Sequence, residues 1–378
     1  MSVDLNILRK KQRLTMVGLM TGTSMDGLDI CVAEVEFGEK SAKINVLETG
    51  SAPYSEKMRT DVEICLELDE KMIAETDDSL GRFMANETTR FLKRHGLNDI
   101  DAVAMHGQTV HHVSGESTLQ IGEPSFLAQA LDVPVISDFR TADITAGGTG
   151  APLIPIVDKW LFQRPEEAVV CLNLGGVANV TYLPPKTSDE LILGFDTGPG
   201  MALLDEASKA LTGNNFDEDG AMAQLGTARE KSVKGWLSHS FITAPPPKST
   251  GRDEFGANWI SEQLPDMNSW RVNDVLATLS LFTARSVAVN CREFLPFETV
   301  KQIIISGGGV YNKSVMRQLE TEFSSVSILT SHELGFDPFM KEALGFAMLG
   351  AAHLKGIPGN LPSVTGASEA VVLGKLTV

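Results

Sequence analysis

The sequence predicts an α/β protein with two domains. Short, apolar, β-branched runs end abruptly in glycine or a polar residue and are followed by helical spacing, which is the pattern of α/β folds. The pattern restarts after a stretch rich in glycine and proline, Thr145–Pro155, which we interpret as a crossing between domains. In addition, 378 residues exceed what one hydrophobic core usually supports.

The first half follows from the periodicity of its apolar residues. The segments 14–20 and 28–37 are expected as two strands joined in a hairpin, with a third strand near 43–50. Helical spacing predicts helices over 56–70, 76–95 and 125–131. Short apolar runs predict strands over 102–105 and 133–137. This half is therefore a sheet with helices that follow its strands.

The second half repeats this beginning. A hairpin is expected over 168–174 and 177–183, followed by a strand at 191–195 and a helix at 202–211 that ends at Gly213. Three prolines predict a loop over 243–255. The last elements are a helix at 272–293, a strand at 302–306 and a helix at 341–355. Beyond the two hairpins, no repeat is visible in the sequence.

Composition and charge exclude several classes of function. The formal net charge of −17 disfavours binding to nucleic acid or anionic membranes, because both require surplus Lys and Arg. The N-terminus is polar, and no run of about 18 apolar residues predicts a membrane span, so we expect a cytoplasmic protein. The four cysteines form no metal-ligand or disulfide pattern and are expected as buried thiols.

Five predicted strands end in polar or glycine-rich sequence. In open α/β sheets ligands bind at the carboxyl ends of the strands, so we expect one cleft there. Each ending taken singly is also explained by an ordinary turn. The five endings are His106-Gly107-Gln108, Asp138-Phe139-Arg140, Asn173-Leu174-Gly175-Gly176, Asp196-Thr197-Gly198-Pro199-Gly200 and Gly307-Gly308-Gly309.

The turn of the first hairpin, in GLMTGTSMDGLDI, combines glycines with hydroxyl side chains. Backbone N–H groups and hydroxyls bind phosphate without a positive charge, although a plain β-turn is the competing interpretation. Asp26 and Asp29 would repel phosphate unless a divalent cation intervened, so the turn implies Mg²⁺. The sequence has no P-loop and no protein-kinase motifs, which excludes those two classes of nucleotide-binding protein. Leu203 occupies the position of the third glycine in a dinucleotide-binding fingerprint, which disfavours a Rossmann dehydrogenase.

Eight blocks in one order carry a resemblance to a known family. They are GLMTGTSMDGLDI, HGQTVHH, SDFRTADITAGGTGAPLIP, NLGGVANVTYL, GFDTGPG, PKSTGRDEF, DVLATLSLFTA and GGGVYN. The chain is similar over nearly its whole length to the anhydro-N-acetylmuramic acid kinases. The resemblance implies the actin, hexokinase and heat-shock-protein-70 type of ATPase fold, which is ribonuclease H-like, with the active site in the cleft between two domains. It also implies a homodimer.

The resemblance divides the chain and assigns its nucleotide-binding residues. Domain I would be 1–140 with 341–378, and domain II 141–340. ATP with Mg²⁺ would be held by three glycine-rich segments, of which the third passes close to the adenosine, where a side chain would collide with it. Their residues would be Gly22, Thr23, Ser24, Met25, Asp26, Gly27, Leu28 and Asp29; Asn173, Gly175 and Gly176; and Gly307, Gly308 and Gly309.

The reaction that the resemblance implies is double. Water opens the 1,6-anhydro bridge of 1,6-anhydro-N-acetylmuramic acid at the anomeric carbon, and the freed O6 takes the γ-phosphoryl group of ATP. The product, N-acetylmuramic acid 6-phosphate, belongs to peptidoglycan recycling. Asp196 occupies the position of the family's catalytic aspartate and would deprotonate the water. A helix N-cap aspartate is the competing interpretation.

Residues that would bind the sugar are His106, Gln108, Asp138, Arg140 and Glu342. Arg140 matches the lactyl carboxylate of a muramic acid, while an internal pair with Asp138 is the alternative. For Glu342 the sequence slightly favours the competing interpretation, a solvated glutamate in the first turn of a helix, where it suits the helix dipole.

Three further residues in the blocks leave questions open. Lys248 and Arg252, in PKSTGRDEF, either border the nucleotide or sugar or carry solvated charges. Met201 stands where the family pattern has Asn, which puts details of substrate positioning in doubt.

Two other functions compete with the anhydro-sugar kinase. The first is another sugar or carboxylate kinase of the same fold, and the second is a nucleotide-dependent interaction module. The module is disfavoured because no substrate-binding domain or polymerisation insert follows the ATPase core.

Overall fold

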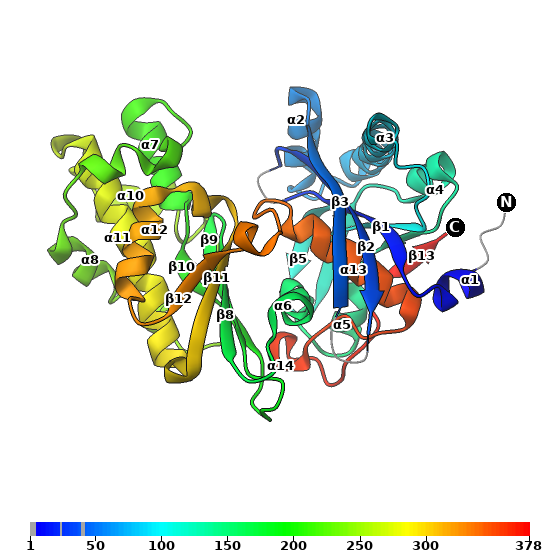
Figure 1. Cartoon of the computed structure of the whole chain (residues 1–378). Coiled ribbons are helices and arrows are strands. Elements are labelled where there is room, and N and C mark those ends of the chain that lie inside the picture. Colours follow the sequence, from blue (N-terminus) through cyan, green and yellow to red (C-terminus); the bar gives the residue numbers. More distant parts are fainter. Residues whose placement is uncertain (1–4, 23–24, 39–41) are drawn as a thin grey trace. The chain divides into compact units, whose positions relative to one another are not determined.

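The computed structural model describes residues 5–22, 25–38 and 42–378 and shows two compact units (Figure 1). Unit 1 comprises Met1–Leu161 and Met340–Val378, and unit 2 comprises Phe162–Phe339. Each unit is built on its own sheet.

Unit 1 is a six-stranded sheet in the order β13-β7-β4-β1-β2-β3. β2 pairs antiparallel with both of its neighbours, while β1, β4 and β7 run parallel. Its strands are β1 (Leu14–Met20), β2 (Gly27–Phe37), β3 (Ala42–Pro53), β4 (Ala102–Met105), β7 (Val135–Ser137) and β13 (Lys375–Thr377), and the separate hairpin is β5 (Gln108–Val113) with β6 (Ser117–Ile121). Its helices are α1 (Leu5–Lys10), α2 (Glu56–Cys65), α3 (Glu70–His95), α4 (Ser125–Leu131), α5 (Thr141–Thr145), α6 (Ile154–Phe162, whose last residue is assigned to unit 2), α13 (Lys341–Lys355) and α14 (Pro362–Thr365).

β1 is buried on both faces, and successive residues face opposite layers. Val17 and Leu19 belong to the core that includes residues of α3. Gly18 lies against α13, where an added Cβ would be 1.9 Å from the carbonyl oxygen of Ala343. Only glycine permits this approach, so Gly18 sets the distance between α13 and the sheet.

Unit 2 is a five-stranded sheet in the order β10-β9-β8-β11-β12. Its strands are β8 (Ala168–Leu174), β9 (Val177–Leu183), β10 (Leu193–Pro199), β11 (Val300–Ser306) and β12 (Ser327–Thr330). Its helices are α7 (Ala202–Thr212), α8 (Glu230–Trp236), α9 (Ser240–Thr243), α10 (Ala257–Gln263), α11 (Val272–Phe294) and α12 (Lys313–Glu322), with short 3-10 turns η1 (Glu218–Gly220), η2 (Ala223–Leu225), η3 (Met267–Ser269), η4 (Phe297–Thr299), η5 (Gly308–Tyr311) and η6 (His332–Leu334).

The two sheets share one topology. Numbered along the chain within each unit, the five main strands have the order 3-2-1-4-5, and the second strand alone is antiparallel to its neighbours. This is the duplicated, ribonuclease H-like arrangement that the resemblance predicted, so the predicted fold class is confirmed. The two hairpins seen in the sequence are the first two strands of each copy.

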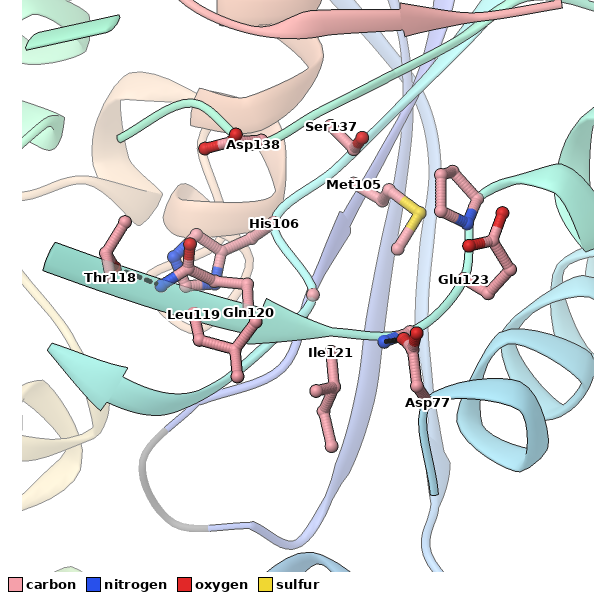
Figure 2. A pocket seen from close by; sticks show the side chains of 13 residues that line it. Asp77, Met105, His106, Thr118, Leu119, Gln120, Ile121, Glu123, Ser137 and Asp138 are labelled. Atoms are coloured by element: carbon pink, nitrogen blue, oxygen red, sulfur yellow. Dashed lines mark hydrogen bonds between the residues drawn. The ribbon is translucent and has the colours of Figure 1, made fainter. Parts of the chain in front are cut away.

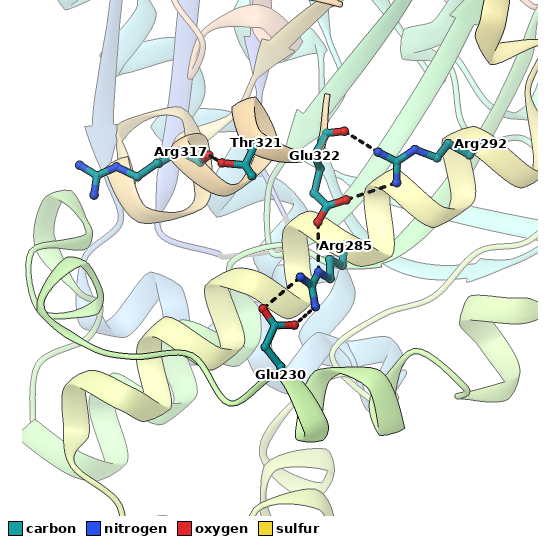
Figure 3. A network of polar contacts seen from close by, with 6 residues as sticks. All are labelled: Glu230, Arg285, Arg292, Arg317, Thr321 and Glu322. Carbon is teal, nitrogen blue, oxygen red and sulfur yellow. Dashed lines mark hydrogen bonds and ion pairs between the residues drawn. The ribbon is translucent and has the colours of Figure 1, made fainter. Parts of the chain in front are cut away.

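α11 is the central helix of unit 2. It is long and apolar enough, by length and composition alone, to cross a membrane, but 72% of its most apolar window is buried within the protein. Such burial is typical of a core helix. Arg285 on α11 bonds to Glu230 of α8 and to Glu322 of α12, and Arg292 also reaches Glu322 (Figure 3). These pairs hold α8 and α12 against the core helix.

The division between the units falls at 161/162, about twenty residues after the boundary expected at 140/141. The intervening segment is fixed to the C-terminal part of unit 1. Asp143 is fully buried and accepts hydrogen bonds from Asn360 and Thr365, each at 2.7 Å. Asp158 forms a buried ion pair with Lys341 at 2.9 Å. These contacts tie residues 141–161 to unit 1. The second boundary, at 339/340, differs from the predicted boundary at 340/341 by a single residue.

Some predicted elements differ from the structure. The helix expected over 56–70 ends at Cys65, and the next begins at Glu70 rather than at residue 76, because the side chain of Asp69 caps the backbone N–H of Met72. The sequence interpretation also lacked the β5–β6 hairpin, α12 and β12. The strands of the hairpin and β12 are short and rich in polar residues. α12 does carry apolar residues at helical spacing, with Val315 and Leu319 buried, so its periodicity was an available signal.

Candidate functional site

In unit 2 three parallel strands end at the same edge of the sheet. β8 ends beside β11, where Asn173 is opposite Ser306, and β10 runs in the same direction at the sheet margin. Asp196 lies within β10 at a bulge between Asp196 and Gly198. Bulges re-aim side chains and are frequent next to active sites. The predicted strand endings of this unit therefore share one edge.

Asp196 is held by one of its two carboxylate oxygens. The hydroxyl of Ser249 and the backbone N–H of Thr250 both donate to Oδ2, each at 2.9 Å. The backbone N–H of Asp196 donates to the carbonyl of Lys248 at 3.2 Å, so the loop runs along the strand. The N-cap interpretation is wrong, because Met201 is the N-cap residue of α7 and Asp196 lies inside a strand.

Burial raises the pKa of Asp196 above its ordinary value, and the hydrogen bonds from Thr250 and Ser249 work against this shift. Lys248 is half-buried, and its ammonium group donates to the carbonyls of Phe241 and Ile242 at 2.9 and 3.1 Å. Burial lowers the pKa of Lys248 to about 8, while the charge of Asp196 opposes the change. Lys248 is therefore not a solvated charge. Its bonds to two backbone carbonyls fix the start of the loop whose next residues, Ser249 and Thr250, contact Asp196.

The second glycine turn is built against the start of α7. The carbonyl of Gly175 accepts from the backbone N–H of Met201 at 2.8 Å, and that of Gly176 accepts from Gly200 at 2.9 Å. An added Cβ on Gly200 would lie 2.3 Å from the Gly175 oxygen, so glycine is required there. Arg252 lies over the turn, because a Cβ on Gly176 would be 3.6 Å from its Nε. Arg252 thus brings a cation to this turn.

The third glycine segment is pressed against β8. Gly307 has φ of +86°, and an added Cβ would be 2.6 Å from the carbonyl oxygen of Leu174. Gly309 would place a Cβ 2.6 Å from the Cβ of Leu174 and 3.0 Å from the sulfur of Met201. The thioether of Met201 therefore packs beneath this segment.

The corresponding edge of unit 1 carries the first glycine turn. Gln108 donates to the carbonyl of Gly22 at 3.3 Å, and Ser51 donates to the carboxylate of Asp29 at 2.6 Å. Asp26 is exposed and Met25 adopts φ of +50°. Thr23 and Ser24 lie outside the described residues. Gly27 and Leu28 begin β2, where a Cβ on Gly27 would meet the backbone of β3.

His106, which is buried, and Arg140, which is partly buried, form a pair just after the ends of β4 and β7. The Nε and one terminal nitrogen of Arg140 approach Nε2 of His106 at 3.2 and 3.0 Å, and a second terminal nitrogen donates to the Gly150 carbonyl at 3.0 Å. Because guanidinium only donates, Nε2 of His106 is the acceptor and the neutral ring carries its proton on Nδ1. Burial, together with the charge of Arg140, lowers the pKa of His106 to about 3.

Asp138 is paired with Lys375 at 2.5 Å and accepts from the backbone N–H of Thr141. The alternative of an internal Asp138–Arg140 pair is therefore not what the structure contains. Burial acts to raise the pKa of Asp138, but the contacts with Lys375 and Thr141 outweigh it and lower the pKa. Asp138 anchors β13 and the start of α5.

Glu342 is partly buried in the first turn of α13 rather than solvated. Burial raises its pKa; the charges of Lys341 and Arg140 lower it, and that of Asp29 raises it further. Glu342 thus shares the electrostatic environment of Arg140 and of the first glycine turn. Of the five predicted sugar-binding residues, all lie at this edge of unit 1 or on α13 packed against it.

A cavity of about 180 Å³ opens beside His106 (Figure 2). It is lined by the ends of β4, β6 and β7, and among its residues are three carboxylates, Asp77, Glu123 and Asp138. His106 and Asp138 border it, whereas Gln108, Arg140 and Glu342 do not. Its acidic lining suits a neutral group better than a carboxylate.

Within residues 5–22, 25–38 and 42–378, no group of three or more His, Cys, Asp or Glu residues could hold a metal ion. Mg²⁺ is usually held by one or two carboxylates together with phosphates and water, so a Mg²⁺ site does not require a cluster of three protein ligands. The oxygen donors Asp26 and Asp29 of the first turn suit Mg²⁺ in kind.

Sequence reasoning missed the residues that hold Asp196. Ser249 and Thr250 stand 53 and 54 positions from it, in a loop recognised only by its prolines. The available signal was the block PKSTGRDEF, in which Ser249 and Thr250 stand between the charged residues Lys248 and Arg252. Lys375, the partner of Asp138, lies in a tail where no strand was predicted.

The duplicated sheet, with glycine turns at its strand ends and a partly buried carboxylate within β10, defines the class as an actin- and hexokinase-like α/β protein. The family model "Anhydro-N-acetylmuramic acid kinase" matches residues 14–378, and the chain belongs to this family of phosphotransferases. The predicted membership is confirmed.

Curated relatives agree over the full length. Anhydro-N-acetylmuramic acid kinase of Caldanaerobacter subterraneus subsp. tengcongensis is 35% identical, with 99% of each chain covered. That of Bacillus cereus strain G9842 is 34% identical, with 96% of this chain and 98% of the relative covered. A solved structure, the activator of the 2-hydroxyisocaproyl-CoA dehydratase from Clostridium difficile, has a TM-score of 0.44 at 11% identity, covering 90% of this chain and 96% of that one. A similarity this low indicates nothing about function.

Proposed function

We propose that this protein is an ATP-dependent kinase that converts 1,6-anhydro-N-acetylmuramic acid into N-acetylmuramic acid 6-phosphate. The relatives that cover the whole chain carry this name. The observation that carries the chemistry is the carboxylate of Asp196, whose Oδ2 accepts two hydrogen bonds. That arrangement supports Oδ1 as the oxygen that receives a proton.

In the proposed reaction a water oxygen bonds to the anomeric carbon and its proton passes to Oδ1 of Asp196. The bond between that carbon and O6 breaks, and O6 takes the γ-phosphoryl group as ADP leaves. A raised pKa strengthens Asp196 as a base near neutral pH. Transfer to O6 replaces the proton that a leaving oxygen normally needs from an acid.

The sugar would be recognised by residues of unit 1. The guanidinium of Arg140 is oriented by His106 and by the Gly150 carbonyl, which supports its assignment to the lactyl carboxylate. The cavity beside His106 carries carboxylates and would exclude the lactyl group, so it suits the neutral acetamido group. Gln108 and Glu342 would contact the remaining hydroxyl groups, and Asp138 would act by anchoring this edge.

ATP would be held by the three glycine segments, with Arg252 as a cation beside the second of them. Mg²⁺ would be bound by the nucleotide phosphates, with Asp26 or Asp29 as protein donors, and it would supply charge neutralisation at the γ-phosphate. We further propose a cytoplasmic homodimer acting in peptidoglycan recycling. Sedimentation of the purified protein would test the dimer.

The test is phosphoryl transfer in ¹⁸O-labelled water with ATP, Mg²⁺ and the anhydro sugar. The expected product carries phosphate on O6 and one ¹⁸O at the anomeric carbon. Asp196→Asn should lower kcat by about 10²–10⁴-fold, whereas Asp219→Asn, an exposed aspartate paired with Lys313, should act like wild type. No phosphosugar from wild type, or full activity in Asp196→Asn, would overturn the proposal. Phosphorylation of another sugar without label uptake would favour the alternative kinase.

A further inference from the structure

Two exposed aromatic rings stack on each other near the end of β11 in unit 2. Tyr311 and Phe339 have centroids 5.2 Å apart and planes inclined by 12°. Tyr311 is 47% exposed and Phe339 is 54% exposed. Leu191, Phe216 and Leu225 of this unit are exposed as well, but the rings of Tyr311 and Phe339 lie against each other beside the third glycine segment. Neither residue takes part in the proposed proton and phosphoryl transfers. The stacked pair therefore offers a flat aromatic surface at the edge of the sheet where ligands of such folds bind.

The pair is fixed by the third glycine segment. Tyr311 ends η5, which begins directly after Gly307. The backbone N–H of Gly307 donates to the carbonyl of Pro338 at 3.1 Å, and that of Phe339 donates to Asp337 at 2.9 Å. An added Cβ on Gly308 would be 2.9 Å from the Phe339 ring. Phe339 thus lies between the glycine turn and Tyr311, and it backs a Tyr311 ring that is 47% exposed.

The surroundings select the kind of ligand. Residues 307–310 carry no charged side chain, and the next cation, Lys313, is engaged with Asp219 at 2.9 Å. An anionic group therefore gains nothing at this position. A flat, uncharged aromatic ring does gain, because stacking on an aromatic side chain stabilises a nucleobase by about 1–3 kcal/mol. Ligands of such sheets lie at this edge, beside the ends of β8 and β11.

We propose that the open face of Tyr311, backed by Phe339, stacks on the adenine base of ATP and sets the preference for a purine nucleotide. The inference rests on the proposed use of ATP and adds the residues that hold its base. The phosphates would lie toward the glycine turns, and the base would cover the exposed ring. Tyr311 and Phe339 are binding residues in this assignment and take no part in the chemistry.

The experiment compares Tyr311→Ala and Phe339→Ala with the matched variant Tyr311→Phe, which keeps the ring and loses the hydroxyl. Calorimetry measures binding of ADP and of inorganic tripolyphosphate, a probe that has phosphates but no base. We expect Tyr311→Ala to weaken ADP by roughly tenfold, Phe339→Ala by less, and Tyr311→Phe by under about twofold. Tripolyphosphate affinity and the KM of the sugar should stay unchanged.

Equal losses for ADP and tripolyphosphate would overturn the assignment, as would unchanged ADP affinity in Tyr311→Ala. A change in oligomeric state without a change in ADP affinity would also overturn it, because the rings would then be a contact between subunits. Thermal melting of each variant verifies the fold. Because ADP binding needs no sugar, a wild-type protein that binds ADP yet fails to phosphorylate the anhydro sugar would refute the proposed function and leave this inference standing.

Discussion

Replacing Ser249 with alanine should move the acid limb of the pH profile of kcat/KM to higher pH. The hydroxyl of Ser249 donates to Oδ2 of Asp196 at 2.9 Å and so favours the charged carboxylate. Without this donor the pKa of Asp196 rises further above its ordinary value, and more of the base is protonated at any acidic pH. Activity is then lost earlier as the pH falls.

The size of the shift follows from the environment of the hydroxyl. A hydrogen bond to a charged group contributes about 1.5–3 kcal/mol, but Ser249 is exposed and water replaces part of the bond. A net loss of about 1 kcal/mol corresponds to about 0.7 pKa unit at 1.36 kcal/mol per unit. Thr250 still donates its backbone N–H, so the carboxylate stays in place. The limb should therefore shift by about half a unit to one unit.

The assay measures kcat/KM for the sugar at saturating ATP across the acid limb, with thermal melting at each pH to verify folding. Ser249→Thr keeps the hydroxyl and should leave the limb where wild type has it. An alanine variant with normal activity and an unmoved limb would refute the role of Ser249. Equal shifts in the alanine and threonine variants would refute the role of the hydroxyl.

Two predictions concern unit 1. Gly18→Ala should destabilise the fold by about 1–3 kcal/mol, because the new Cβ would overlap the backbone of α13; Gly235→Ala, with no atom within 4 Å, is the control in urea unfolding. His106 is neutral in the folded protein, with a pKa of about 3 against an ordinary value of 6.5. Because the unfolded chain binds the proton first, the stability that His106 confers is complete above pH 6.5 and is lost as the pH falls toward about 3. His106→Gln should remove this contribution, which is up to about 1.4 kcal/mol per pH unit. The free energy of unfolding should then fall less steeply as the pH is lowered below 6.5. An unchanged slope would contradict it.

The sequence predicted those elements whose apolar runs are bounded by strong breakers. The strands at 168–174 and 177–183 agree with the structure to the residue, because two glycines separate them. The boundary between α2 and α3 was wrong because the capping aspartate, Asp69, has no apolar signature. The β5–β6 hairpin was missed for a similar reason: its strands are short, polar and only partly buried.

For the site, the sequence by itself determined the family and marked Asp196 and the glycine turns as candidates, because these are local patterns of residue type. It placed Asp196 after the end of a strand, whereas β10 continues through Asp196 to Pro199. Only the tertiary structure decided that Ser249 and Thr250 occupy Oδ2 of Asp196, and that Arg140 pairs with His106 rather than with Asp138. These contacts join residues far apart in the chain. Their distances depend on strand register and loop path, which are set by the packing of whole sheets and helices and leave no mark in the local sequence.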